Sequence, residues 1–190
     1  MKKPSKKQKM ILTTAMKLFT QESYIPVGVD RIITESNVAK MTFYKYFPSK
    51  EELVLACLQE LKLDIQMGVE HSISGQTHPL AKLYQLYMWY INWISQDETR
   101  GCPFHKARMD VGELYPSIFI VLDEYQDWLF QLTLSLFEQL NMNNPTFLAR
   151  LFINILDGVI SDSAYDKNLL QPQKTWAYIN TLIELEKNRK

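Results

Sequence analysis

The sequence predicts an all-α fold with about nine helices. Apolar residues recur at three- and four-residue steps along almost the whole chain, and no segment shows the two-residue alternation of a half-buried strand. Only 6 glycines and 8 prolines occur in 190 residues, so long regular helices are expected. Hydrophobic residues make up 46% of the chain and charged residues 22%, which is the composition of an ordinary globular protein.

Three short helices are predicted in the first fifty residues. The first begins at Ser5, because Ser5 and Gln8 have the spacing of a capping box. The second covers about residues 29–36 and the third about residues 38–46. Asn37 lies between them, and asparagine tolerates a left-handed turn conformation better than most residues. Two short helices joined by so tight a turn form the helix-turn-helix pattern.

Longer helices are predicted after residue 50. Ser49 and Glu52 form a second capping box, which starts a long helix. Three later prolines stand where a first helical turn accepts them. The remaining helices are therefore expected at residues 80–95 and 104–109 and after Pro116, Pro145 and Pro172.

Charge is distributed unevenly along the chain, although the net charge is +0. Residues 1–50 carry ten Lys and Arg against three Asp and Glu, whereas residues 51–190 carry eleven against eighteen. A basic N-terminal part on an acidic body indicates that the N-terminal part meets phosphate. A solvated lysine tail explains the same charge without any ligand.

Several classes of protein are disfavoured by the sequence. No apolar run approaches the roughly 20 residues of a membrane span, and the basic N-terminus leads into no apolar signal region. Cys57 and Cys102 form no disulfide or metal framework, so a reduced, cytoplasmic setting is expected. Neither a nucleophile–base pair nor a phosphate-binding glycine loop is found, so no enzyme and no cofactor are predicted.

The third short helix is predicted to have one buried and one exposed face. With Phe43 at the centre of the buried face, Phe47 lies about 40° away and Tyr46 about 60° away. Four other residues fall about 100° or more away and are expected to be exposed, namely Met41, Thr42, Tyr44 and Lys45. Such a face suits insertion into a DNA major groove. A partly exposed packing helix with incidental lysines is the alternative.

The stretch "VGVDRIITESNVAKMTFYKYFPSKEELV", residues 27–54, resembles the DNA-binding signature of the TetR (tetracycline-repressor-like) transcriptional regulators. The resemblance lies in the Val29-Asp30 opening, the turn at residues 36–38 and the run at residues 42–51. It covers about the first 55 residues, and the remainder is similar only in layout. The residues expected to bind DNA are Gly28, Lys40, Met41, Thr42, Tyr44, Lys45, Tyr46 and Lys50.

Three positions depart from the family pattern. Gly28 stands where the family has a capping threonine, Ala39 where it has a serine, and Asn37 where it has a glycine. Asn37 is expected to take over the cap of the third helix, with the loss of one phosphate contact. Four lysines are expected to compensate by reaching the DNA backbone or minor groove, namely Lys2, Lys3, Lys6 and Lys7.

The resemblance implies a homodimer on a roughly palindromic operator, with a DNA-binding domain at residues 1–50 and a ligand-binding and dimerisation domain at residues 51–190. The last two helices would form a four-helix bundle with those of the partner. The expected interface residues are Leu148, Leu151, Ile155, Trp176, Ile179 and Ile183. The expected ligand-binding residues, which are otherwise ordinary core, are Tyr87, Trp89, Ile91, Phe104, His105, Arg108, Tyr125, Trp128 and Phe152.

The resulting functional prediction is a repressor that a small, largely apolar or aromatic effector releases from its operator. The effector would have to bind one of two states more tightly than the other. The alternative is a TetR-like architectural protein that has no effector. Cys102, at the start of a short helix, is either a reactive thiol or a small buried side chain.

Overall fold

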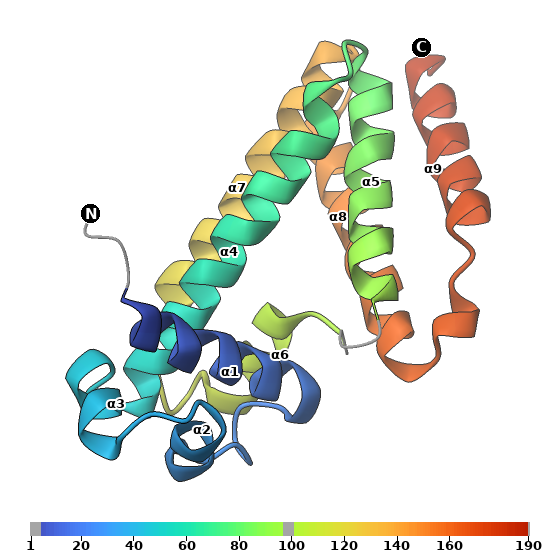
Figure 1. The fold of residues 1–190 in the computed structure, drawn as a ribbon. Helices are drawn as coiled ribbons and strands as arrows, with labels where there is room; N and C mark the ends of the chain where they lie inside the picture. Colours follow the sequence, from blue (N-terminus) through green and yellow to red (C-terminus); the bar gives the residue numbers. More distant parts are fainter. Residues whose placement is uncertain (1–4, 97–100, 190) are drawn as a thin grey trace. The chain divides into compact units, whose positions relative to one another are not determined.

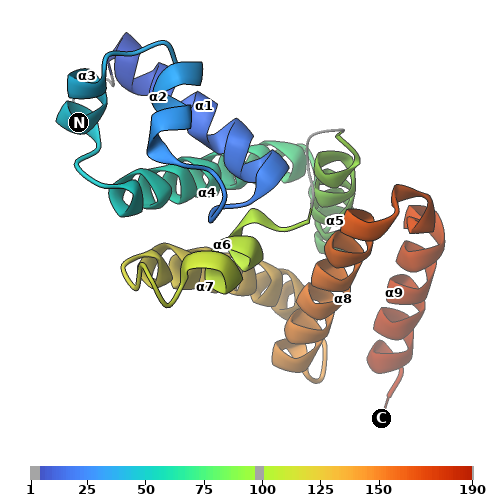
Figure 2. The same ribbon diagram turned by 90° about the horizontal axis from the view of Figure 1, so that it is seen from below.

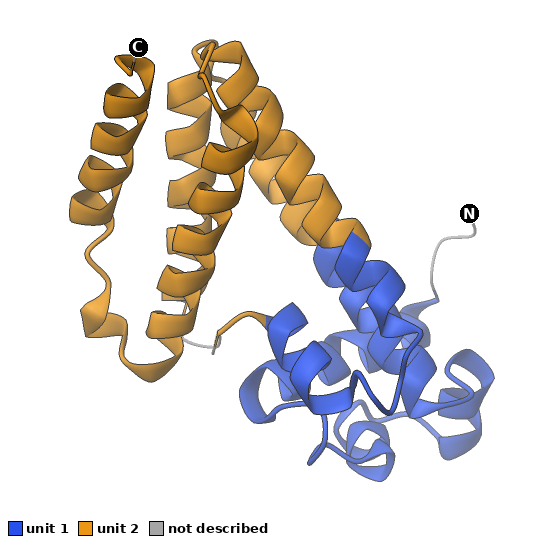
Figure 3. Cartoon of the chain, turned by 180° about the vertical axis from the view of Figure 1, so that it is seen from behind, with its two compact units in different colours: residues 1–63, 103–123 blue, residues 64–102, 124–190 orange. Residues whose placement is uncertain are grey.

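The computed structural model describes residues 5–96 and 101–189, and these residues form an all-α fold, as predicted. Nine α-helices and one short 3-10 helix occur in this part of the chain (Figure 1). The chain divides into two compact units, residues 1–63 with 103–123 and residues 64–102 with 124–190 (Figure 3). No helix among the described residues is both long and apolar enough to span a membrane.

Unit 1 contains the N-terminal helices together with a later segment of the chain. Its complete helices are α1 (Lys6–Glu22), α2 (Val29–Glu35), α3 (Lys40–Tyr46) and α6 (Pro103–Val111). Helices α1, α2 and α3 pack against one another around Ile11, Ile32 and Phe43, whose side chains are fully buried. Burial of these apolar side chains stabilises α2 and α3, which have 7 residues each and are too short to be stable alone.

The predicted helix signals at both ends of the segment predicted to bind DNA are confirmed. The Ser5 hydroxyl accepts a hydrogen bond from the Gln8 amide at 3.2 Å, and α1 begins at the next residue. The Ser49 hydroxyl accepts one from the Glu52 amide at 3.1 Å, where α4 (Lys50–Ser74) begins. Asn37 has a φ of 52°, which is the left-handed turn expected between α2 and α3.

Ser23 ends α1 in an unusual backbone conformation. Its φ of 87° and ψ of 171° lie in a region that is essentially reserved for glycine. A residue with a Cβ is held there at a cost of about 1–3 kcal/mol, and only where its surroundings fix it. The Ser23 amide still donates to the Phe19 carbonyl at 3.1 Å and so closes the last turn of α1.

Unit 2 is a bundle of longer helices. Its complete elements are α5 (Pro79–Ser95), α8 (Pro145–Tyr165), η1 (Lys167–Leu169) and α9 (Pro172–Lys187). Helix α5 packs against α8 and α9, and α8 and α9 run side by side (Figures 1 and 2). Pro79, Pro145 and Pro172 each stand in a first helical turn, where a proline lacks only an N–H that has no partner within the helix.

Gly68 allows a close approach between α4 and α5 inside unit 2. A Cβ added at Gly68 would lie 2.6 Å from Cζ2 of Trp89, so the indole ring rests directly on the α4 backbone. Any other residue would have to push this large ring aside. The glycine therefore fixes where α5 crosses α4.

Two helices belong partly to each unit. The boundary falls after residue 63 within α4 and after residue 123 within α7 (Ile118–Gln139), as the colour change in Figure 3 shows. The units therefore differ from the two segments predicted from sequence, because unit 1 also includes residues 51–63 and 103–123. The functional division at residue 50 stays a prediction.

Candidate nucleic-acid interface

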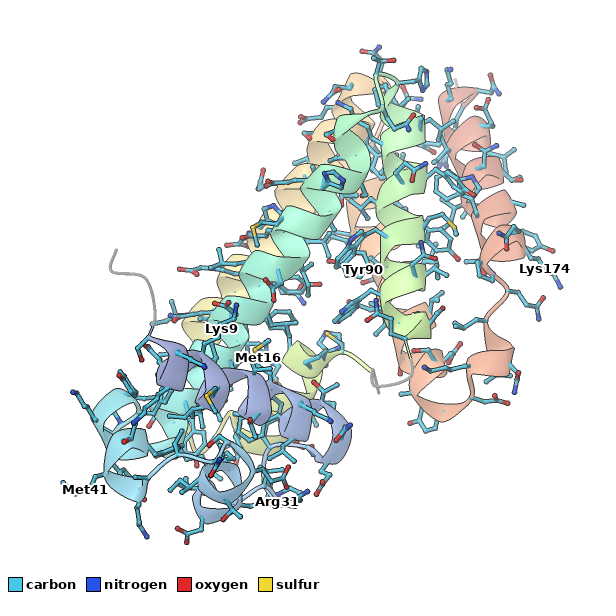
Figure 4. All side chains as sticks on the ribbon, in the orientation of Figure 1. Lys9, Met16, Arg31, Met41, Tyr90 and Lys174 are labelled. Carbon is cyan, nitrogen blue, oxygen red and sulfur yellow. The ribbon has the colours of Figure 1, made fainter. Side chains whose placement is uncertain are left out.

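The second helix of the helix-turn-helix, α3, has the two faces expected from its sequence. Phe43 is 0% exposed and Phe47 is 3% exposed, so both belong to the core of unit 1. Met41 is 87% exposed and points away from the other helices (Figure 4). Tyr44 is 43% exposed. The helix thus offers a mixed polar and apolar surface of the kind that reads base edges.

The aromatic ring of Tyr44 packs against the buried ring of Phe43. Its centroid lies 5.3 Å from that of Phe43, with the two rings nearly perpendicular. This edge-to-face geometry is the favourable one for aromatic pairs. It holds the ring in place while the hydroxyl remains able to bond to a phosphate or a base. Thr42 and Tyr46, beside it, are half-buried, so Thr42 is less exposed than its position on the helix predicted.

The basic side chains near α3 are not equally available. Lys45 is exposed, and Lys40 is exposed but lies 3.2 Å from the Asp30 carboxylate. Arg31 contacts two carboxylates, those of Glu22 and Glu35, and these ion pairs raise the pKa of its guanidinium. Lys45 and Lys40 are therefore more available than Arg31 for a phosphate contact. The sequence alone did not predict this difference between the two lysines and the arginine.

Lys50 has a structural contact that the sequence did not reveal. Its Nζ donates to the Ile25 carbonyl at 3.2 Å, and partial burial lowers the pKa of its ammonium. Ile25 lies in the connection between α1 and α2, so Lys50 ties that connection to the first turn of α4. An ammonium has three donors, so this bond is compatible with a phosphate contact as well.

The expected N-cap of α3 was wrong. Asn37 does not cap α3, because the N-cap residue is Ala39, in extended conformation and without a side-chain cap bond. Asn37 instead adopts the left-handed backbone conformation of the turn. It lies two residues before the N-cap position of α3. Gly28 is the N-cap of α2 and likewise has no side chain to contribute.

Ala39→Ser is expected to stabilise the protein. The backbone at residue 39 is already extended, with φ −70° and ψ 144°, so a serine hydroxyl would reach the first free amides of α3. The expected gain is about 1 kcal/mol in the free energy of unfolding, or about 2–4 °C in Tm for a chain of this size. Thermal unfolding followed by circular dichroism measures it. Ala39→Val, which adds volume but no acceptor, is the control and should give no gain.

Part of the basic N-terminal segment lies beside the turn of the helix-turn-helix. A groove of about 390 Å³ lies between the start of α1 and the end of α2. Its lining residues are Lys6, Lys9, Met10, Thr13, Thr14, Glu35, Ser36 and Asn37. Lys7 is exposed, and Lys2 and Lys3 lie outside the described residues. Lys6 is thus near the α2–α3 turn, whereas a direct contact with DNA stays a prediction.

The predicted ligand-binding residues are divided between the two units. Phe104, His105 and Arg108 belong to unit 1, where Phe104 is buried and the other two are exposed. The guanidinium of Arg108 lies 5.2 Å from the ring centre of Phe119. The other predicted residues belong to unit 2 and are buried or half-buried, namely Tyr87, Trp89, Ile91, Tyr125, Trp128 and Phe152.

Unit 2 brings some of these residues together around a tyrosine that the sequence did not single out. The Tyr90 and Tyr125 hydroxyls are 2.8 Å apart and buried, and burial raises the pKa of both phenols. Trp89 packs edge-on against Tyr90 at 5.1 Å, and Trp128 lies 6.2 Å from Tyr125. The ligand-binding role of this aromatic cluster stays a prediction.

The predicted dimer residues are largely buried within a single chain. Ile179 and Ile183 are 4% and 3% exposed, because they pack against α8. Leu148 is also buried, whereas Leu151, Ile155 and Trp176 are half-buried. The exposed apolar side chains on α8 and α9 are others, namely Phe147, Tyr178, Leu182 and Leu185. A groove of about 490 Å³ beside them includes Phe147, Leu182 and Leu185 in its lining.

Metal-ligating groups do not gather anywhere in the described ranges: three or more His, Cys, Asp or Glu side chains placed to hold an ion are not found there. Both cysteines are free and buried, and burial raises the pKa of the Cys57 thiol. Cys102 is 7% exposed, so its side chain is largely shielded from solvent.

Helices α2 and α3, with their tight turn and exposed second helix, form a helix-turn-helix motif. Residues 11–57 match the family model described as bacterial regulatory proteins, tetR family. The match includes α2, α3 and the first turns of α4.

Known proteins resemble the chain in sequence and in fold. An uncharacterised HTH-type transcriptional regulator of Bacillus subtilis, YuxN, is 48% identical over 27% of this chain and 18% of its own. The Escherichia coli regulator RutR is 33% identical over 63% of this chain and 53% of its own. The chain therefore spans about half or less of the length of these relatives. The crystal structure of SCO4454, a TetR-family transcriptional regulator from Streptomyces coelicolor, has a TM-score of 0.82 at 21% identity, covering 94% and 92% of the two chains.

The DNA-binding signature and the fold agree. Residues 11–57 match the tetR-family model, and the fold of the chain is similar to that of a TetR-family transcriptional regulator.

Proposed function

We propose that this protein is a dimeric repressor that binds a roughly palindromic DNA operator and is released from it by a small, largely apolar or aromatic effector. The observation that supports the proposal most directly is the exposed face of α3, which carries Met41, Tyr44 and Lys45. Phe43 and Phe47, on the opposite face, are buried in the core of unit 1. This is the arrangement of a recognition helix that enters the major groove.

Dimerisation is proposed from the surface of α8 and α9. Phe147, Tyr178 and Leu185 are each at least 60% exposed on one chain, although they are large and apolar. A second copy of the same surface would cover them, because a two-fold axis pairs a patch with itself. Two copies would also present two recognition helices, as a palindromic operator requires.

Release by an effector is proposed from the continuity of α4. This helix of 25 residues begins beside the recognition helix and continues into unit 2, which contains the aromatic cluster of Tyr90 and Tyr125. An effector that favoured one arrangement of unit 2 would shift the population of states at the other end of the same helix. Aromatic side chains suit an apolar or aromatic effector with few polar groups.

The experiment that tests the DNA-binding proposal is a selection from random-sequence DNA duplexes. The full chain should enrich a sequence with two related half-sites about 10 base pairs apart, or a multiple of that spacing. Enrichment of no sequence over repeated rounds at physiological salt would contradict operator binding. Addition of a library of apolar and aromatic metabolites to the selected complex then tests release. A protein that binds its operator but responds to none of them would favour the architectural alternative.

Lys50→Ala is expected to weaken binding to all DNA sequences to a similar degree. The variant loses a phosphate contact of one ammonium and also the bond to the Ile25 carbonyl. The slope of log affinity against log salt should fall by about 1 for each lost phosphate contact. Fluorescence anisotropy at several salt concentrations measures it. Lys174→Ala, which removes an exposed lysine of α9, is the control and should leave the slope unchanged.

A further inference from the structure

Asp110, on α6, holds the residue that ends α1. Its carboxylate accepts a hydrogen bond from the Ser23 hydroxyl and another from the Tyr24 amide, the latter at 3.2 Å. Ser23 has the backbone conformation that only glycine adopts readily, with φ 87°. One carboxylate therefore binds both the side chain of the strained residue and the next amide of the chain.

Two further hydrogen bonds join α6 to the same end of α1. The Lys106 ammonium donates to the Thr20 carbonyl at 3.0 Å. The Tyr24 hydroxyl donates to the Pro103 carbonyl at 3.1 Å, and its ring stacks on Phe19. Tyr24 is 3% exposed, so the contact is part of the core of unit 1. Helix α6 thus belongs with the DNA-binding helices, although its residues lie about 80 positions later in the chain.

The connection between α1 and α2 determines how α2 enters the helix-turn-helix. It runs from Ser23 to Gly28, the N-cap of α2, and its Ile25 carbonyl accepts the bond from Lys50. Asp110 fixes one end of this connection and Lys50 its middle. A strained residue persists only where its surroundings fix it, and Asp110 provides that restraint here.

We infer that Asp110 is a positioning residue for DNA binding: by holding Ser23 in a glycine-like conformation it sets the entry of α2, and through α2 the presentation of α3. The inference rests on the proposed DNA-binding function. It assigns to α6 a role in operator affinity that does not require contact with DNA. It also predicts that DNA affinity no longer depends on Asp110 when residue 23 is a glycine, which adopts this backbone conformation without strain.

The test is a double-mutant cycle between Asp110→Ala and Ser23→Gly. Asp110→Ala should lower affinity for the wild-type-selected duplex at least tenfold, because Ser23 then relaxes. Ser23→Gly alone should bind within about threefold of wild type, since glycine tolerates φ 87°. The double variant should recover most of the tenfold loss, a rescue that the mere removal of a packing contact would not give. Glu113→Ala, which removes an exposed carboxylate just beyond α6, is the matched control and should bind as wild type.

A second measurement makes the test independent of DNA. Amide hydrogen exchange at Tyr24 should be faster in Asp110→Ala than in wild type, because the amide loses its acceptor. If no variant binds a selected duplex but exchange at Tyr24 responds as expected, the proposed function fails while the restraint by Asp110 stands. Should Asp110→Ala fail to fold, Asp110→Leu, which keeps the size of the side chain but has no acceptor oxygen, takes its place in both measurements. Two results would overturn the inference. One is that Asp110→Ala lowers the affinity equally in the wild-type and Ser23→Gly backgrounds. The other is that amide exchange at Tyr24 is unchanged in Asp110→Ala.

Discussion

Tyr44→Ala is expected to abolish most of the sequence-specific DNA binding while leaving the fold intact. Tyr44 is 43% exposed, and its ring is held edge-on against Phe43 at 5.3 Å, so its hydroxyl is presented by a rigid support. Loss of a residue that touches a base or phosphate costs about 1–3 kcal/mol per site, and a dimer on a palindrome loses it twice. The affinity for the selected duplex should therefore fall by a factor of about 30 or more.

The measurement is anisotropy of the labelled duplex at fixed salt, with circular dichroism to verify the fold. Tyr165→Ala removes an equally large aromatic side chain that is 86% exposed at the end of α8, and it serves as the matched control. The control should bind as wild type. Wild-type affinity in Tyr44→Ala would mean that another face of the helix-turn-helix meets the DNA.

Leu185→Glu is expected to separate the proposed dimer into monomers. Leu185 is 64% exposed on one chain, next to Phe147 and Leu182 in the groove of α8 and α9. In a two-fold interface each substitution occurs twice, and a buried carboxylate without a partner costs about 3–5 kcal/mol. The dissociation constant of the dimer should rise at least about a thousandfold. Analytical ultracentrifugation over a range of concentrations measures the mass.

Gln173→Glu is the control for the added charge, because residue 173 is exposed on the same helix about 120° around its axis. This variant should remain dimeric. A charge at Ile179 is a poorer test than Leu185→Glu, since Ile179 is 4% exposed within one chain and its replacement would disturb folding itself. A dimeric Leu185→Glu would place the interface on another surface of the protein.

Local signals in the sequence were sufficient to predict where most helices of this protein lie, although Pro116 was expected to open α7 and instead precedes its first residue, Ile118, by two positions. A capping box acts over three residues, and the amides of Gln8 and Glu52 donate to the hydroxyls of Ser5 and Ser49 as expected. A proline in a first turn is equally local, which is why the starts of α8 and α9 were predicted at Pro145 and Pro172. The buried face of α3 followed from helical spacing alone.

Contacts between distant parts of the chain could not be predicted in this way. Nothing in the residues around Ser23 indicates that Asp110, 87 positions later, accepts a hydrogen bond from its hydroxyl. The bond from Lys50 to the Ile25 carbonyl depends on the three-dimensional path of a connection, not on a motif. Ile179 and Ile183 were assigned to a partner because apolar content shows burial but does not distinguish one chain from two.

The contact between Gly68 and Trp89 limits the motions available to α4. A shift of α4 along α5 by about one turn, roughly 5.4 Å, would bring the side chain of residue 64 or 72 against the indole ring that now lies on bare backbone. Piston-like sliding is therefore blocked, and the two helices keep a single register. The effector signal proposed for α4 is therefore expected to be a tilt in which α5 moves together with α4.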